Sequence, residues 1–329
     1  MRVVAAPDKF RSSASAQEIA ESIGRAVTSW GGLIDLAPMA DGGEGTLEAL
    51  GGANRTMVVQ GPLGESVEAE WRLSGGVAVI EMAQASGLLL AGGAEGNLPL
   101  DASTVGTGQL ILQAVEQGAE KIIVAVGGSA TTDGGLGALE AMGSLARYRG
   151  VELLVACDVR TRFVDAAQVF GPQKGASAAQ VNLLSRRLNR LAQVYQERFG
   201  FDVLALDRAG AAGGLAGGLA AVGGQLVDGA DLVADELLLD ELLEGADLVV
   251  TGEGCLDESS FEGKVVGGVA AYAAAVGVDF LVVAGRIDSK VAGRVAAVSL
   301  VEEFGEKTAM AKTGECVEAA VGSYLREHF

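Results

Sequence analysis

The sequence predicts an α/β protein built from two α/β lobes. Apolar, β-branched runs alternate with stretches of helical period along most of the chain, as in folds with parallel sheets. One group of close-spaced strands interrupts this alternation near residues 57–82, which is typical of antiparallel pairing. The chain has 329 residues and is 49% hydrophobic, so it is long enough for two domains with sizeable cores.

Both ends of the chain alternate strands with helices. Ser15, followed by Glu18 at capping-box spacing, marks the start of the first helix. Strands are expected at 2–6, 33–38, 248–250 and 280–284, and helices at 15–27, 44–50 and 264–275. We expect residues 1–55 and 235–329 to form one discontinuous Rossmann-like or flavodoxin-like lobe.

The middle of the chain predicts a mixed lobe, residues 56–234. It begins with an antiparallel excursion, whose strands are separated by glycine turns at 61–64 and 74–76. α/β alternation then resumes. The expected strands are 57–60, 67–73, 77–82, 121–126 and 151–157, and the expected helices are 105–117, 136–142 and 179–199.

Charge and composition exclude several partners. The net charge of −19 would repel nucleic acid and anionic membranes, and aromatic residues make up only 5% of the chain. Residues 209–227 are uncharged but consist mostly of Gly and Ala, so we interpret them as a glycine-rich loop and a buried helix. We therefore expect no membrane or nucleic-acid partner, and the prediction leaves a homodimer open.

The cysteine and histidine residues indicate the cellular compartment and limit the kinds of catalysis that the sequence allows. Cys157, Cys255 and Cys316 are widely spaced and odd in number, and no secretory leader is visible, so a cytoplasmic location is expected. His328, next to the last residue, is the only histidine. A position so close to a terminus largely excludes Ser-His-Asp and Cys-His catalysis and histidine-bound zinc.

Three segments place carboxylates within glycine-rich turns after apolar runs: 41–45, 127–135 and 251–257. A strand, a glycine turn and a helix in succession direct backbone N–H groups at an anion. Carboxylates beside such turns can bind a divalent cation or accept a proton. The pattern indicates an enzyme that handles phosphate groups with magnesium.

Seven ordered motifs extend over nearly the whole chain. They are Ala-Pro-Asp-Lys-Phe at 6–10, Met-Ala-Asp-Gly-Gly-Glu-Gly-Thr at 39–46, Gly-Gly-Ser-Ala-Thr-Thr-Asp-Gly-Gly-Leu-Gly at 127–137, Ala-Cys-Asp-Val at 156–159, Val-Phe-Gly-Pro-Gln-Lys-Gly-Ala at 169–176, Gly-Ala-Ala-Gly-Gly-Leu at 210–215 and Val-Thr-Gly-Glu-Gly at 250–254. In this order they resemble the bacterial glycerate kinases of the glycerate kinase I type.

The resemblance implies ATP-dependent phosphorylation of D-glycerate with Mg²⁺. It also implies a two-lobed α/β protein with its active site in the cleft between the lobes. We favour 2-phosphoglycerate over 3-phosphoglycerate as the product. Two positions depart from the family pattern: Arg11-Ser12-Ser13 replaces a Lys-Gly sequence, and Cys255 stands where arginine is usual. A kinase for another small hydroxy acid, or a non-catalytic ligand-binding homologue, are the alternatives.

No Walker or Rossmann glycine motif is present, so ATP requires another cradle. The alternative interpretation is that the glycines only permit tight turns and close packing. The predicted substrate- and phosphate-binding residues are Asp8, Gly127, Gly128, Ser129, Thr131, Asp133, Gly134, Lys174, Gly213, Gly214 and Lys264.

The acids that end strands are the candidates for chemistry. Each could instead cap a helix or stabilise a turn. The predicted catalytic residues are Lys9, Asp41, Asp158 and Asp257, and the predicted metal ligands are Asp41, Glu44 and Glu253.

Overall fold

The computed structural model describes residues 1–261 and 263–329, which form two compact units. Unit 1 comprises Met1–Asp41, Glu48–Leu50 and Ala230–Phe329, and unit 2 comprises Gly42–Leu47 and Gly51–Gly229. Relative to the sequence-based division, residues 42–47 and 51–55 move into unit 2, and residues 230–234 move into unit 1. No helix in the described part of the chain is long and apolar enough to cross a membrane.

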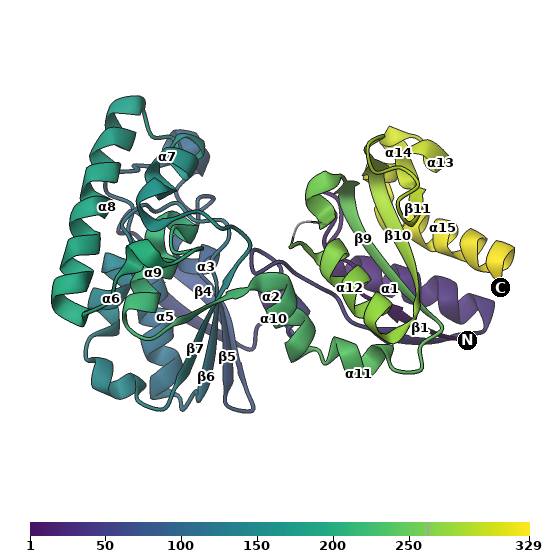
Figure 1. The fold of residues 1–329 in the computed structure, drawn as a ribbon, viewed down its shortest axis with the longest axis horizontal. Coiled ribbons are helices and arrows are strands. Elements are labelled where there is room, and N and C mark those ends of the chain that lie inside the picture. Colours follow the sequence, from purple (N-terminus) through teal and green to yellow (C-terminus); the bar gives the residue numbers. More distant parts are fainter. Residues whose placement is uncertain (262) are drawn as a thin grey trace. The chain divides into compact units, whose positions relative to one another are not determined.

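Unit 1 contains a five-stranded sheet in which every pair is parallel (Figure 1). The strand order is β11-β10-β9-β1-β2. The strands are β1 (Arg2–Ala5), β2 (Leu33–Leu36), β9 (Leu248–Leu256), β10 (Asp279–Ile287) and β11 (Ala296–Ser299). The sequence predicts all of these except β11.

Helices cover both faces of this sheet because alternate side chains of each buried strand point in opposite directions. Val3 and Ala5 of β1 pack in one cluster with α1 (Ala16–Trp30) and α15 (Thr313–His328), whereas Val4 and Ala6 pack in another with α12 (Val265–Val276). Ser15 and Glu18 form the predicted capping box at the start of α1. The remaining helices are α10 (Gly229–Glu236), α11 (Leu239–Leu243), α13 (Leu300–Phe304) and α14 (Glu306–Ala311).

Strand β9 is longer than predicted, and this corrects the interpretation of residues 251–257 as a glycine turn. The strand continues to Leu256, with Glu253 paired to Ala284 and Cys255 to Arg286 of β10. A Cβ atom added to Gly252 would lie 2.5 Å from the carbonyl oxygen of Val283. The glycine therefore permits close strand approach here, and Glu253 is held by a sheet rather than by a loop.

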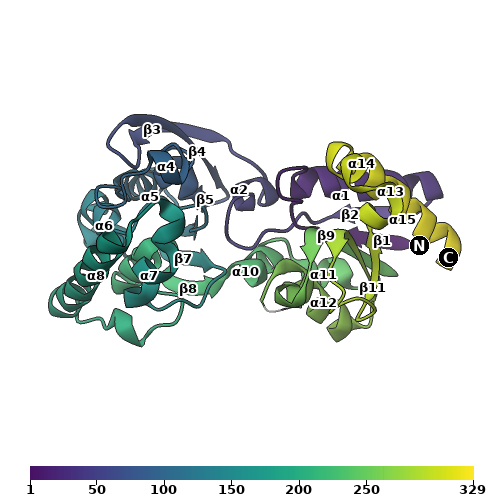
Figure 2. The same cartoon turned by 90° about the horizontal axis from the view of Figure 1, so that it is seen from above.

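Unit 2 contains a six-stranded mixed sheet, ordered β3-β4-β5-β6-β7-β8. The first three strands are antiparallel, as predicted, and β5 to β8 are parallel. Figure 2 shows this sheet from above. Its strands are β3 (Arg55–Gln60), β4 (Ser66–Ser74), β5 (Val77–Glu81), β6 (Lys121–Ala125), β7 (Glu152–Cys157) and β8 (Gln225–Asp228).

The helices of unit 2 include the three predicted from sequence: α5 (Val105–Glu116), α6 (Leu136–Met142) and α8 (Ala178–Phe199). The predicted helix at 44–50 is shorter, as α2 (Thr46–Ala49), and spans both units. Further helices are α3 (Ala83–Ser86), α4 (Gly93–Gly96), α7 (Ala166–Phe170) and α9 (Leu215–Ala221). The last of these is the buried helix expected within 209–227.

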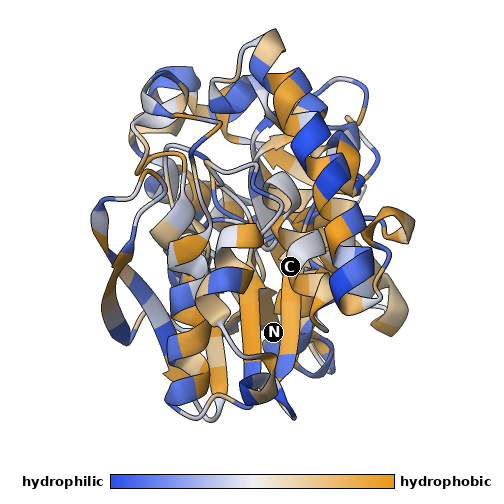
Figure 3. Ribbon diagram, turned by 90° about the vertical axis from the view of Figure 1, so that its left-hand side faces the viewer, coloured by the Kyte–Doolittle hydropathy of each residue, from blue (hydrophilic) through white to orange (hydrophobic). Residues whose placement is uncertain are grey.

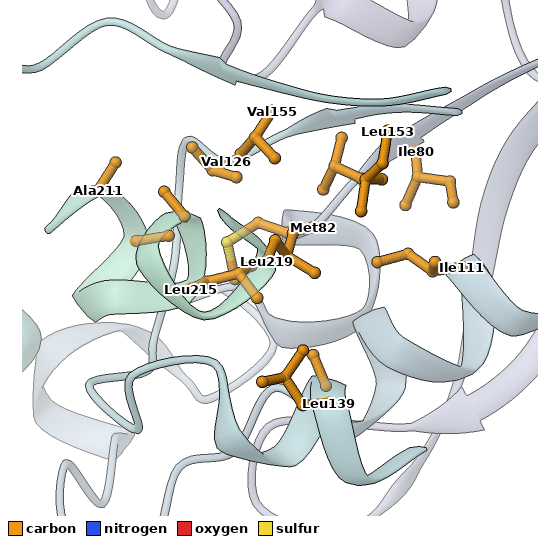
Figure 4. Packing of buried hydrophobic residues seen from close by; sticks show 14 of the residues in the cluster. Ile80, Met82, Ile111, Val126, Leu139, Leu153, Val155, Ala211, Leu215 and Leu219 are labelled. Carbon is orange, nitrogen blue, oxygen red and sulfur yellow. The ribbon is translucent and has the colours of Figure 1, made fainter. Parts of the chain in front are cut away.

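The core of unit 2 lies between its sheet and these helices. Val126 and Val155 face Leu215 and Leu219 of α9, while Met82 lies between them and Ile111 of α5 (Figure 4). The hydropathy colouring follows this arrangement, with largely hydrophobic strands and helices that carry both hydrophobic and hydrophilic residues (Figure 3). Burial of these aliphatic side chains is the main source of stability in such a core.

Two glycine segments of unit 2 pack backbone against backbone. Gly213 adopts φ +66°, and a Cβ atom there would overlap the carbonyl oxygen of Thr131. Gly214 adopts φ +92°, and its Cβ atom would lie 2.8 Å from the Cα atom of Gly134. Close packing against the 127–135 turn thus explains why glycine is required at both positions. The phosphate contact predicted for these two glycines stays a prediction.

Gly213→Ala should destabilise the protein by about 3 kcal/mol or more, because the methyl group forces the Thr131 backbone to move. Gly223→Ala is the matched control. Gly223 also has a positive φ, +104°, but open space around its Cβ position, so only about 1–2 kcal/mol of backbone strain is expected. Urea unfolding of both variants measures the difference. Equal losses would contradict this packing role of Gly213.

Candidate active site

The carboxyl ends of three neighbouring strands in unit 1 bring three acids together. Beyond β1, the N–H groups of Ala6 and Asp8 donate to the carbonyls of Val250 and Gly252, both at 2.8 Å. These bonds extend the pairing with β9 and place Asp8 beside Glu253. On the other side, Met39 N–H donates to the carbonyl of Pro7 at 2.9 Å. The chain after β2 therefore runs alongside the segment that carries Asp8 and leads to Asp41.

This position is the topological switch point of the sheet. The connection from β1 to β2 runs through α1 on one face, and that from β9 to β10 runs through α12 on the other. The two connections leave the β1/β9 pair in opposite directions, which opens a crevice at the carboxyl ends of these strands. Ligands of open α/β sheets bind in such crevices.

A cavity of 320 Å³ occupies this place in unit 1. Its acidic lining includes Asp8, Asp41 and Glu253, and Phe10, Leu300 and Ala309 contribute apolar wall. Four cations also line it: Lys9, Arg11, Lys264 and Arg286. The cavity therefore offers both signs of charge to a small polar ligand.

Burial raises the pKa of two of these acids, and repulsion by neighbouring carboxylates adds to the effect at Asp8. Burial, reinforced by the neighbouring Asp41 charge, raises the pKa of Asp8 to about 7. Burial likewise raises the pKa of Glu253, and its Oε1 atom has no hydrogen-bond partner within the described residues. Asp41 itself is only 9% exposed. A carboxyl group with a pKa near neutrality suits proton transfer, and closely placed carboxylates suit a cation.

Asp257 lines the same cavity but is held in a local turn. Its Oδ1 atom accepts hydrogen bonds from the Ser259 N–H group at 2.8 Å and from the Ser259 hydroxyl at 2.6 Å. The Ser259 hydroxyl bond is the main reason that the pKa of Asp257 is lowered. Lys264 Nζ donates to the Ser259 hydroxyl at 2.7 Å. The hydrogen bonds of the Asp257 carboxylate thus stabilise a local turn. The catalytic role predicted for Asp257 stays a prediction.

In unit 2, Asp133 joins two helix starts. Its Oδ2 atom accepts hydrogen bonds from the N–H group and the hydroxyl of Thr104, both at 2.8 Å, and its Oδ1 atom accepts from Gly135 N–H at 3.0 Å. The carboxylate therefore ties the residue before α5 to the residue before α6. Asp133 thus has a structural role, and its predicted contact with substrate or phosphate stays a prediction.

Lys174 lies beneath the 127–135 turn rather than at its surface. It is 3% exposed, and its Nζ atom donates to Ser129 Oγ at 2.6 Å and to the carbonyl of Thr131 at 2.7 Å. Burial lowers the pKa of its ammonium group to about 7. Lys174 positions the turn, and two of its donors are already used.

The turn itself retains anion-binding capacity. The N–H groups of Gly127, Gly128 and Thr131 have no hydrogen-bond acceptor in the described part of the chain. A Cβ atom on Gly127 would lie 2.5 Å from the Cα atom of Gly43, so the turn packs against the segment that carries Glu44. That segment is anchored by Glu81, which accepts hydrogen bonds from Gly45 and Leu47, both at 2.8 Å.

Two further predicted residues, Asp158 and Glu44, belong to unit 2. Asp158 follows β7 and is exposed. Glu44 belongs to unit 2, whereas Asp41 and Glu253, the two other predicted metal ligands, line the cavity of unit 1. The described residues contain no group of three or more His, Cys, Asp or Glu side chains arranged to hold a metal ion by themselves.

Sequence reasoning missed Arg286 and Glu81. Arg286 follows Gly285 in β10, at the carboxyl end of a predicted strand, so the rule that located Asp8 could have found it. Glu81 ends β5 in the same way, but it is 5% exposed and acts on backbone N–H groups rather than facing a ligand.

Comparisons with known proteins identify the family of the chain. A family model described as "Glycerate kinase family" matches residues 3–147 and 144–327. The chain is 41% identical over 325 residues to a glycerate kinase of Halalkalibacterium halodurans, covering 87% of this chain and 85% of the relative. It is 40% identical over 311 residues to glycerate 2-kinase of Escherichia coli, covering 82% and 81%.

A solved structure gives the same result. The crystal structure of a Salmonella typhimurium LT2 protein, provisionally designated glycerate kinase 2, superposes with a TM-score of 0.83 at 34% identity and covers 99% of both chains. The chain belongs to the glycerate kinase family. It is therefore an enzyme of the kinase class.

Asp8→Asn should stabilise unit 1, because it removes the carboxyl group whose pKa is raised in the folded protein. The folded-state pKa of about 7 lies above the usual 3.8, so the wild-type carboxyl destabilises the fold progressively as pH rises from about 4 to about 7. The asparagine keeps the Oδ1 acceptor for Lys9 N–H. We expect a gain of roughly 1–3 kcal/mol at pH 8 and little gain at pH 4.

Thermal unfolding in the presence of a chelator, at pH 8 and pH 4, measures both values. A variant that is less stable than wild type at pH 8 would contradict the repulsion between Asp8, Asp41 and Glu253.

Proposed function

We propose that the chain transfers the γ-phosphoryl group of ATP to D-glycerate and that the product is 2-phosphoglycerate. The observation that carries the proposal is the Asp8 carboxyl at the switch point of unit 1, with a pKa near 7, in a cavity that also presents four cations. The name of the Escherichia coli relative, glycerate 2-kinase, supports the choice of product.

The cavity has the groups that a hydroxy acid requires. Arg286, whose guanidinium group forms an ion pair with Glu306 in the cavity lining, would exchange that partner for the carboxylate of the acid. Asp8 accepts the proton of the attacking hydroxyl group as the oxygen–phosphorus bond forms. A three-carbon acid fills only part of 320 Å³, which leaves room for the transferred phosphoryl group. Lys9 and Lys264 then face the negative charge of that group.

The residues also fit a magnesium ion. Asp41 and Glu253 would hold it, and the buried, unpartnered Oε1 atom of Glu253 supplies a ready ligand. Mg²⁺ binds through one or two carboxylates together with water and substrate phosphates, so a complete protein cage is unnecessary. When bound, the ion would neutralise charge on the transferring phosphoryl group.

Arg286 also bears on substrate choice. Cys255 stands where the resemblance to glycerate kinases leads us to expect arginine, and it pairs in register with Arg286 on β10. Both residues line the cavity. The neighbouring strand thus provides a guanidinium group next to Cys255, which favours glycerate over a substrate without a carboxylate.

Purified protein with ATP and Mg²⁺ should release ADP with D-glycerate and much more slowly with other hydroxy acids. Phosphorus NMR of the product distinguishes the 2-phosphate from the 3-phosphate. Excess chelator should abolish turnover. Absence of ADP release with every hydroxy acid would refute the proposed kinase activity. Full activity in excess chelator would refute the proposed magnesium requirement.

Asp8→Asn should lower kcat by about 100-fold or more, because the amide cannot accept the hydroxyl proton. Asp288→Asn is the matched control, since Asp288 is an exposed acid outside the cavity lining. It should keep kcat within about twofold. Normal turnover of Asp8→Asn would remove Asp8 from the reaction.

A further inference from the structure

A second cavity lies entirely within unit 2, beside the 127–135 turn. Its volume is 450 Å³, within the range of small-molecule sites. The lining is almost wholly apolar and comes from α8, from the start of α6 and from the segment 99–102. Leu188 and Leu191 of α8 form one wall, and Leu100 lies among the residues that form another. Neither the proposed chemistry nor the cavity of unit 1 uses this space.

A buried hydroxyl group without a partner lies in this lining. Thr132 is 2% exposed, and its Oγ1 atom makes no hydrogen bond within the described residues. An unpaired buried hydroxyl costs free energy, commonly on the order of 1–3 kcal/mol. Thr132 is one of the residues that line the cavity, and a rotation of its side chain would let a ligand there provide the missing hydrogen bond.

The rim of the cavity is positively charged in a strongly acidic protein. Helix α8 carries Arg186, Arg187, Arg190 and Arg198 against the single acid Glu197, although the chain has a net charge of −19. Arg187 and Arg190 line the cavity against one acid, Asp133, whose carboxylate is hydrogen bonded to Thr104 and Gly135. The charge favours a ligand with an apolar body and an anionic tail.

One of these arginines is fixed across the cavity. Arg187 Nη1 donates to the carbonyl oxygen of Leu100 at 2.7 Å, which links α8 to the segment 99–102. The bond holds the planar guanidinium group at the cavity lining. A planar cation of this kind stacks on aromatic rings and attracts phosphate oxygens.

We infer that this cavity binds the adenine base of the nucleotide, with the phosphates directed toward Arg190 and the glycine turn. A purine is flat and largely apolar, and its ring nitrogens and amino group can pair with the Thr132 hydroxyl. The anionic triphosphate matches the charge of α8. The inference rests on the proposed use of ATP, but the binding of the base can be measured without turnover.

The variant Val194→Trp tests whether adenosine occupies this cavity. Val194 lines the cavity, and the larger side chain should fill it. We expect the Kd for adenosine, measured by titration calorimetry, and the KM for ATP to rise about tenfold or more, with the KM for glycerate within about twofold. Gln196→Trp, at an exposed position of the same helix outside the lining, is the matched control. It should bind adenosine normally.

Thr132→Val tests the hydroxyl group and changes the side-chain shape least. Loss of an unpaired buried hydroxyl should raise the melting temperature of the ligand-free protein. Adenosine binding should nevertheless weaken by about fivefold or more, because the ligand loses its hydrogen bond. A stabilised variant with unchanged adenosine affinity would overturn the role of Thr132.

The outcomes separate this site from the proposed activity. Adenosine binding that Val194→Trp abolishes, in a protein that phosphorylates no hydroxy acid, supports the cavity and refutes the activity. ATP-dependent turnover with a KM for ATP that neither variant alters refutes the cavity and leaves the activity standing. Tripolyphosphate binding as tight as that of ATP, with no measurable adenosine binding, also refutes it.

Discussion

The parallel pairing of β9, β1 and β2 is the constraint on which the candidate active site depends. Adjacent parallel strands end at the same edge of a sheet, so acids that follow them must lie close together. Asp8 and Asp41 are placed in this way, and Glu253 lies beside Asp8 near the end of β9. In this partly buried cavity the charges of Asp41 and Glu253 add to the cost of ionising Asp8. The free energy of sheet formation keeps these carboxylates close together in spite of their repulsion. A flexible loop could not hold them in this way.

Cations compensate this charge locally rather than across the molecule. The protein as a whole is strongly acidic, yet Lys9, Arg11, Lys264 and Arg286 line one cavity and the arginines of α8 lie beside the other. Screening by salt is weakest where charges are partly buried. The positive charge of the protein is thus concentrated at these two places, while the acidic surface elsewhere favours solubility.

The sequence was sufficient to predict the fold class and most strands. The most buried strands, β1, β5, β6, β7 and the first half of β9, are short apolar, β-branched runs bounded by turn residues, and this length and composition favour a strand over a helix. Short helices such as α10, α11, α13 and α14 were missed because five to eight residues carry little periodicity, and the longer helix α15 was missed as well. Strand β9 was predicted too short, since Gly252 and Gly254 suggest a turn unless the close neighbouring backbone of β10 is known.

The candidate site divides in the same way. Asp8 and Asp41 could be predicted because each follows a strand at its carboxyl end. Asp133 and Lys174 occur in motifs of the same appearance, and their hydrogen bonds also hold the turn together, while their predicted ligand contacts stay predictions. One-dimensional patterns locate polar residues near strand ends. Whether such a residue faces a ligand or its own backbone depends on burial and on partners distant in sequence.

The division of the chain also constrains the order in which it can fold during synthesis. Val3 of β1 pairs with Leu248 of β9, whereas unit 2 is formed by the nearly continuous stretch between them. Because protein synthesis proceeds from the N-terminus, all of unit 2 leaves the ribosome before the central strand pair of unit 1 can form. Unit 2 is thus an insertion that can fold first. The apolar strand β1 and helix α1 can complete their packing only after the last hundred residues have been synthesised. The N-terminal segment is the part of this protein most in need of protection while the chain is incomplete.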